Sequence, residues 1–282
     1  MVITEPGVYD LPAEVYHRDP VQGGSLSSSG ARKLLATCPA RFRYELDNPP
    51  ESTAAMNLGT AAHRLVLGVG AELVEIEATD WRTKAAKEQR DEALAAGMVP
   101  LLTEQHEQVH AMAAALREHE LASVLLSGAG KPEQTLVWRD GPSGVWRRML
   151  ADFLPEVEPT GRMYLTDYKT SVSAHPAAIS KAIESYGYHA QGAWYVDGVK
   201  ALGLAEEVPF FLVVQEKTRP YFVSVVQLNA LALDAGRYAN RRAIELYADC
   251  RKSDHWPPYV EGLAQIGLPG WAENRFLQEV TS

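Results

Sequence analysis

Apolar residues recur at helical spacing through most of the first half of the chain. In the segment 103–126, the positions Val109, Met112, Leu116 and Leu121 predict one long helix with a buried stripe. Other segments combine an amphipathic pattern with an N-cap residue, a proline or a charged face, which also predicts helix. Their predicted ranges are 31–36, 39–47, 53–67, 80–96, 176–202 and 230–250.

From Glu133 onward, short β-rich stretches alternate with turn residues. The predicted strands are 135–138, 145–153, 162–168, 209–215 and 221–228. This order of elements is typical of an α/β domain wrapped by a helical lobe. We expect one domain over 1–282. It consists of a mainly helical N-terminal lobe (1–130), an α/β core that carries the chemistry (131–228), and a C-terminal helix with a loop-like tail (229–282).

Composition narrows the class of protein. The 282 residues are 46% hydrophobic and 22% charged, which is ordinary for a soluble globular enzyme. No apolar run approaches the roughly 18 residues of a membrane span, and the start of the chain has no secretory pattern. Two cysteines, Cys38 and Cys250, are too few for a structural zinc or iron–sulfur cluster and indicate free thiols in the cytoplasm.

The strongest chemical signal is a pair of acidic strand ends followed by a lysine. Asp152 lies at the end of one predicted strand, and Asp167 and Lys169 lie at the end of the next. Residues two apart on a strand share a face, and pairing of the strands would bring Asp152 beside Asp167. Two carboxylates suit Mg²⁺, and a lysine can hold an attacking water. The alternative is a surface hairpin with an ordinary Asp/Lys ladder, but Phe153 and Leu165 favour burial.

Two further features accompany this hairpin. His63 follows small residues in the run G-T-A-A-H, where it is either a structural histidine or a ligand. Tyr188, Gln191 and Tyr195 share one face of a predicted helix. We interpret Tyr188 as part of an aromatic core stripe, whereas the amide of Gln191 requires polar partners.

Taken in order, these residues resemble the PD-(D/E)xK nuclease superfamily, and within it the RecB/RecE-like branch of phage exonucleases (exonuclease VIII type). The resemblance covers nearly the full chain. It rests on Gly59…His63, Glu133, Asp152, Asp167-Tyr168-Lys169 and Gln191…Tyr195, together with Tyr16-His17…Asp19-Pro20, Ser25 to Ser29, Cys38-Pro39-Ala40 and Trp256…Tyr259…Pro269-Gly270-Trp271. Ala151 stands where many members have proline, and Asp167 replaces the commoner glutamate; both lie within the range of the family.

The resemblance implies a role for each residue. Asp152, Asp167, His63 and the backbone carbonyl of Tyr168 would bind the catalytic metal, and Glu133 would contact a second one. Lys169 would position or activate the attacking water. Gln191 and Tyr195 would steady the DNA strand near the scissile phosphate.

The resemblance also implies an activity and partners. The enzyme would be a Mg²⁺-dependent exodeoxyribonuclease, with Mn²⁺ as the other candidate metal, acting 5′→3′ from the ends of linear double-stranded DNA. It would form a homo-oligomeric ring and work with a RecT-like single-strand annealing protein in the cytoplasm of a bacterial host, encoded by a phage or prophage. A ring would reconcile DNA binding with the net charge of −9, because only its channel must be basic. Candidate phosphate contacts are Arg32, Lys33, Arg41, Arg43, Arg147 and Arg148.

Two alternative functions stay open. One is a catalytically inactive module that binds DNA ends on the same fold. The other is a zinc metalloprotease, because His106-Glu107-Gln108-Val109-His110 matches H-E-x-x-H on a predicted helix. Its polar flanks and the absence of a third histidine at a known spacing argue against the protease.

Overall fold

The computed structural model describes residues 2–48 and 58–281. A seven-stranded mixed sheet forms its centre, in the order β1-β5-β6-β7-β8-β9, with β2 pairing with β6. The strands of this sheet are β1 (Gly7–Asp10), β2 (Leu26–Ser27), β5 (Gly130–Arg139), β6 (Trp146–Pro155), β7 (Leu165–Ser171), β8 (Phe210–Glu216) and β9 (Val223–Gln227). Two short strands, β3 (Leu73–Ile76) and β4 (Val99–Leu102), pair in parallel as a separate ribbon.

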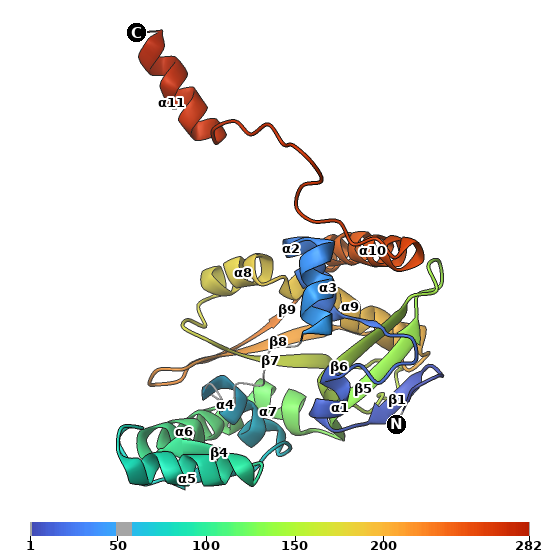
Figure 1. Cartoon of the computed structure of the whole chain (residues 1–282). Coiled ribbons are helices and arrows are strands. Elements are labelled where there is room, and N and C mark those ends of the chain that lie inside the picture. The colour runs from blue at the N-terminus through green and yellow to red at the C-terminus, as the bar shows by residue number, and fades with distance from the viewer. Residues whose placement is uncertain (1, 49–57, 282) are drawn as a thin grey trace.

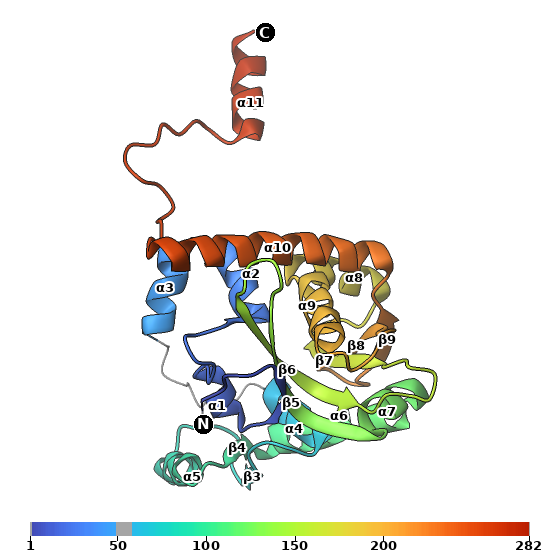
Figure 2. The same cartoon turned by 90° about the vertical axis from the view of Figure 1, so that its right-hand side faces the viewer.

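Helices cover both faces of the sheet. The helices of the described residues are α1 (Ala13–His17), α2 (Ser28–Ala36), α3 (Pro39–Asp47), α4 (Leu58–Leu67), α5 (Lys84–Ala95), α6 (Thr103–Glu118), α7 (Glu120–Ser127), α8 (Pro176–Ser185), α9 (Tyr188–Ala201), α10 (Ala230–Ser253) and α11 (Gly270–Val280), of which α11 lies in the tail away from the sheet (Figure 1). The layer with α2, α9 and α10 lies on one side, and the layer with α4, α6 and α7 lies on the other (Figures 1 and 2). This arrangement confirms the predicted α/β class, with a mixed sheet flanked by helices.

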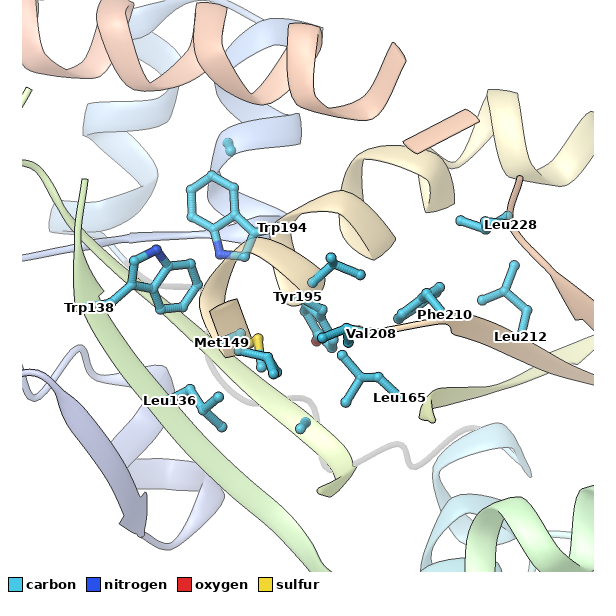
Figure 3. Packing of buried hydrophobic residues seen from close by; sticks show 14 of the residues in the cluster. Leu136, Trp138, Met149, Leu165, Trp194, Tyr195, Val208, Phe210, Leu212 and Leu228 are labelled. Carbon is cyan, nitrogen blue, oxygen red and sulfur yellow. The ribbon is translucent and has the colours of Figure 1, made fainter. Parts of the chain in front are cut away.

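The larger core lies between the sheet and the α9–α10 layer. Figure 3 shows Trp138 on β5 beside Trp194 on α9, with Met149, Leu165 and Phe210 continuing the apolar layer along the sheet. Burying an aromatic or aliphatic side chain stabilises a fold by about 1.5–3 kcal/mol relative to leaving it exposed. This packing therefore fixes α9 against β6 and β7, the strands that carry the predicted acidic residues.

Two predicted helices are each broken into two. The segment 103–126 divides into α6 and α7 at His119, whose Nδ1 accepts a hydrogen bond from the backbone N–H of Ala122 at 3.2 Å and so caps α7. The break rotates Leu121 out of the predicted stripe, and this side chain is 49% exposed. The segment 176–202 divides at Gly187, which adopts φ +66° in the left-handed region that glycine tolerates.

The C-terminal tail extends away from the body of the domain (Figure 1). A loop was predicted for 256–271, and the structure adds the helix α11 directly after it. In the described part of the chain, no helix has both the length and the apolar character that crossing a membrane requires.

Candidate active site

The acidic strand ends come together on β6 and β7. These strands run antiparallel with Phe153 opposite Thr166, so the next residues along each strand, Asp152 and Asp167, are neighbours across the pair. The backbone N–H of Tyr168 donates a hydrogen bond to Oδ2 of Asp152 at 3.0 Å. The strand pairing expected from the sequence therefore places both carboxylates at one position in the sheet.

Asp167 is held on both of its oxygens. Lys169 Nζ lies 2.6 Å from Oδ2, and Gln191 Nε2 on α9 donates to Oδ1 at 2.7 Å. The residue is only 1% exposed. Burial raises the pKa of Asp167, the charge of Asp152 raises it further, and Lys169 opposes both effects. Burial would lower the pKa of Lys169, but the charges of Asp167 and Asp152 outweigh it, so the net pKa is raised and the amine stays charged.

Asp152 is linked to the helical layer by His63. Nε2 of His63 on α4 lies 3.0 Å from Oδ2 of Asp152. Burial would raise the pKa of Asp152, yet the charge and hydrogen bond of His63 outweigh this effect and leave the pKa lowered. Burial would likewise lower the pKa of His63, and Asp152 raises it overall. Each partner thus favours the charged form of the other.

Glu133 faces the same centre from β5. The register runs from Pro132 opposite Phe153 to Gln134 opposite Ala151, so Glu133 stands across from Asp152. Its φ of +46° lies in the left-handed region, where a non-glycine residue is strained. Burial raises the pKa of Glu133; the charge of His63 lowers it and that of Asp152 raises it again. The carboxylate therefore belongs to this electrostatic cluster.

Tyr195 lies behind the site rather than at its surface. Its hydroxyl donates to the carbonyl of Leu150 at 2.8 Å, and its ring packs edge-on against Phe210 in the core (Figure 3). Burial raises the pKa of Tyr195 well above its ordinary value, and the charge of Asp167 adds to the effect. In this position Tyr195 supports β6 two residues before Asp152; the expectation that it contacts DNA directly does not match this placement.

Arg147 and Arg148 lie in the interior, although phosphate contacts were expected for both. Arg147 is 5% exposed, and its guanidinium lies between the rings of Trp138 and Trp194, 4.8 and 4.0 Å from their centroids. Burial lowers the pKa of Arg147 to about 10. Arg148 Nη1 is 2.9 Å from Oδ2 of Asp19 and donates to the hydroxyl of Ser25 at 2.7 Å. Both side chains have structural partners, so they do not form a DNA surface.

The N-terminal basic residues divide into two groups. Lys33 and Arg41 pair with Glu45, and Arg43 pairs with Asp47, so acidic neighbours balance all three exposed cations. Arg32 instead contacts the end of α8, where its Nη1 donates a hydrogen bond to the carbonyl of Tyr186 at 2.6 Å. The pairs Arg41–Glu45 and Arg43–Asp47 follow the i,i+4 spacing of a helix and are readable from the sequence. The pairing of Lys33 with Glu45 joins α2 to α3 and depends on the fold.

The two histidines of the H-E-x-x-H segment lie side by side on α6. Nε2 of His106 and Nε2 of His110 are 3.2 Å apart, and Nδ1 of His106 lies 3.5 Å from Glu75. Within residues 2–48 and 58–281, no three histidine, cysteine or acidic side chains are grouped as a set that could hold a metal ion. The histidine pair thus lacks the third ligand of a zinc protease.

Among the described residues, Asp152, Asp167 and His63 do not form a ready set of three metal ligands. His63 and Lys169 are instead paired with the two carboxylates. The donor chemistry nevertheless fits a hard cation. A buried carboxylate, Asp167, lies beside a partly buried one, Asp152, and the charge of Asp152 raises the pKa of Asp167. A divalent cation relieves this kind of repulsion. The residues that would hold it are Asp152, Asp167 and His63, with the Tyr168 carbonyl and Glu133 as predicted additions.

A pocket beside Lys169 was missed by the sequence analysis. Tyr186, Tyr188 and Lys217 are among its lining residues. The available sequence signal is the pair of tyrosines around Gly187, but the predicted continuous helix includes only Tyr188 in a core stripe and assigns no role to Tyr186.

This sheet, with an acidic residue on β6 and the D-x-K triplet on β7, matches a known family. The model of a PDDEXK-like domain of unknown function covers residues 27–267, and the chain belongs to this family. The fold is therefore PD-(D/E)xK nuclease-like. Among solved structures, a chain from Eubacterium rectale titled "Putative exonuclease" is similar, with 13% sequence identity and a TM-score of 0.60 over 97% of this chain and 99% of that one. No curated protein matches the sequence.

Proposed function

We propose that this protein is a metal-dependent exodeoxyribonuclease that degrades linear double-stranded DNA from its ends, in the 5′→3′ direction. One observation carries the proposal: Asp167 is bound by Lys169 on one oxygen and by Gln191 on the other, directly beside Asp152. Structural ion pairs rarely need a second carboxylate, here the partly buried Asp152, facing the first, since the repulsion is costly. A nuclease needs such a pair to bind a cation and phosphate together.

Each side chain has a distinct task in this proposal. Mg²⁺, or Mn²⁺ in its place, would be held by Asp152, Asp167 and His63 and would supply an activated water and charge neutralisation at phosphorus. Lys169, which keeps its proton at neutral pH, stabilises the negative charge that develops on the attacked phosphate. Gln191 fixes the orientation of Asp167 through its 2.7 Å hydrogen bond. Tyr195 holds β6 in place through the carbonyl of Leu150.

The cellular setting is part of the same proposal. We place the enzyme in the cytoplasm of a bacterial host, encoded by a phage or prophage, where a RecT-like annealing protein receives the single strand it produces. A homo-oligomeric ring around the duplex would concentrate basic residues in a channel although the chain carries a net charge of −9.

The test compares linear and closed circular DNA, each with Mg²⁺, with Mn²⁺ or with EDTA. We expect wild type to degrade the linear form only, and only with metal. Lys169→Ala should lose most of this activity, while Lys200→Ala, which removes an exposed lysine on α9, should keep it. Cutting of the circle would indicate an endonuclease on the same fold. No cutting by wild type with either metal would leave the inactive DNA-end-binding module as the better interpretation.

A further inference from the structure

A pocket of 180 Å³ opens directly beside the D-x-K lysine. Its lining comes from β7, from α8 with the start of α9, and from the segment after β8. The lining residues that matter here are Lys169, Val172, Tyr186, Tyr188 and Lys217. This volume is smaller than the about 300–1,000 Å³ of typical small-molecule sites, so the pocket suits one ring system rather than a whole nucleotide.

Two tyrosines make an aromatic surface that begins at the catalytic centre. Lys169 Nζ lies 5.4 Å from the ring centroid of Tyr188, and the rings of Tyr188 and Tyr186 are 5.6 Å apart with an angle of 37° between their planes. Tyr186 caps the C-terminus of α8, and this residue is 64% exposed. A core residue would bury its ring. Tyr186 instead presents it to solvent at the mouth of a pocket that contains the D-x-K lysine.

The charges around the pocket favour an anionic ligand. Lys217 lines it, Lys169 lines it while paired with Asp167, and among the described lining residues there is no carboxylate. Arg32 reaches the rim from α2 through its hydrogen bond to the carbonyl of Tyr186. In a chain with a net charge of −9, the placement of Lys217 and Arg32 beside an exposed aromatic ring is a specific arrangement. Proteins that hold single-stranded nucleic acid combine these two features, since bases stack on aromatic rings and phosphates meet cations.

We propose that this pocket receives the base of the DNA nucleotide next to the scissile phosphate, stacked on Tyr186, while Lys217 and Arg32 face the adjoining phosphates. The inference rests on the proposed nuclease function and adds to it a base-binding subsite. A base can enter the pocket only from an unpaired strand, so the subsite selects a terminal nucleotide that has left the duplex. Stacking is tolerant of sequence because every base has an aromatic face.

The experiment uses the full chain and four proteins: wild type, Tyr186→Ala, Tyr186→Phe and Tyr238→Ala. Tyr238 is an equally exposed tyrosine on α10 and serves as the matched control. Binding of a labelled single-stranded DNA oligonucleotide is measured by fluorescence anisotropy in EDTA, so that no cleavage interferes. A second oligonucleotide carries abasic residues at its end. Cleavage of duplexes with normal or abasic ends is measured in parallel with Mg²⁺.

We expect Tyr186→Ala to weaken binding of the normal oligonucleotide by about tenfold, within the range measured for loss of one base stack. Tyr186→Phe and Tyr238→Ala should bind as wild type does. On the abasic oligonucleotide, wild type and Tyr186→Ala should bind equally weakly, because the base that Tyr186 contacts is absent. Equal losses on both oligonucleotides, or no loss on either, would overturn the inference.

The two proposals fail in different ways. If wild type cuts DNA and Tyr186→Ala behaves like wild type in both assays, the base subsite is wrong and the nuclease function stands. If binding depends on Tyr186 and on the base but no DNA is cut with Mg²⁺ or Mn²⁺, the subsite stands and the nuclease function is wrong. If wild type neither binds nor cuts, both are overturned.

Discussion

His63 Nε2 lies 3.0 Å from Asp152 Oδ2 and so connects α4 to β6 at the centre of the proposed site. The link joins residues from the two halves of the chain, and it raises the pKa of His63 while lowering that of Asp152. Breaking it should therefore change how stability depends on pH.

We expect His63→Ala to lower the free energy of unfolding by about 1.5–3 kcal/mol near pH 5.5, the usual value for a hydrogen bond to a charged group, and by less near pH 8.5. A histidine whose folded pKa is raised stabilises fully below its ordinary pKa of 6.5, and this stabilisation is lost as the pH rises through the folded pKa. Denaturant unfolding in EDTA at both pH values measures this. In an Asp152→Asn background the pH-dependent difference should vanish; its persistence would show that another partner controls His63.

Removal of Gln191 should shift the acid limb of the pH–rate profile. Burial already raises the pKa of Asp167, and the Gln191 amide favours its charged form through the 2.7 Å hydrogen bond. Gln191→Leu should therefore raise that pKa further and move the acid limb to higher pH. At pH 7 the rate of DNA cleavage should fall by about 10- to 100-fold. An unchanged profile with a lower plateau would instead indicate a role for Gln191 in binding the strand.

Lys169→Ala should reduce stability as well as activity. It leaves Asp167 buried without its cation, and breaking one side of a buried pair costs up to about 3–5 kcal/mol. Because the lysine side chain is partly exposed, we expect a loss of about 1–3 kcal/mol, measured by thermal or denaturant unfolding. The double variant Lys169→Ala/Asp167→Asn should regain part of this stability without regaining activity. If the double variant were less stable than the single one, the ion pair would not be the cause.

Replacing Arg147 should change stability but not DNA binding, and replacing Arg32 should change DNA binding but not stability. Arg147→Ala empties the space between Trp138 and Trp194 and should lower the free energy of unfolding by about 2–4 kcal/mol. It should leave the salt dependence of DNA binding unchanged. Arg32→Ala should affect stability little and reduce the slope of log binding constant against log salt by about 1. A reduced slope in Arg147→Ala would instead show that Arg147 contacts a phosphate, as the sequence led us to expect.

The acidic centre could be predicted because it depends on local rules. Alternation along two strands places Asp152, Asp167 and Lys169, and strand pairing brings them together. The interior position of Arg147 could not be predicted, because it depends on two tryptophans from different elements that meet only in the folded core. A charged residue in a strand is usually exposed, and nothing nearby in the sequence marks this exception.

The two helix breaks are a second feature that could not be predicted from the sequence. Apolar spacing continues across His119 and Gly187, so periodicity predicts two long helices, whereas a side-chain cap and a left-handed glycine end them. The second break also determines the aromatic pocket. Tyr186, the residue that caps the end of α8, is exposed, whereas Tyr188, the first residue of α9, is partly buried, and no single helical stripe describes this pair.

Tyr168 lies between Asp167 and Lys169, and its own side chain leads to the opposite layer. The hydroxyl of Tyr168 donates to Gln215 at 2.6 Å, and Gln215 donates to the carbonyl of Met112 on α6 at 2.8 Å. The ring of Tyr168 lies against His63 on α4. The middle residue of the D-x-K triplet thus connects β7 to the helical lobe through these contacts. Because these contacts join the lobe to the strand that carries the two charged side chains, we expect loosening of the lobe to disturb the reaction centre as well.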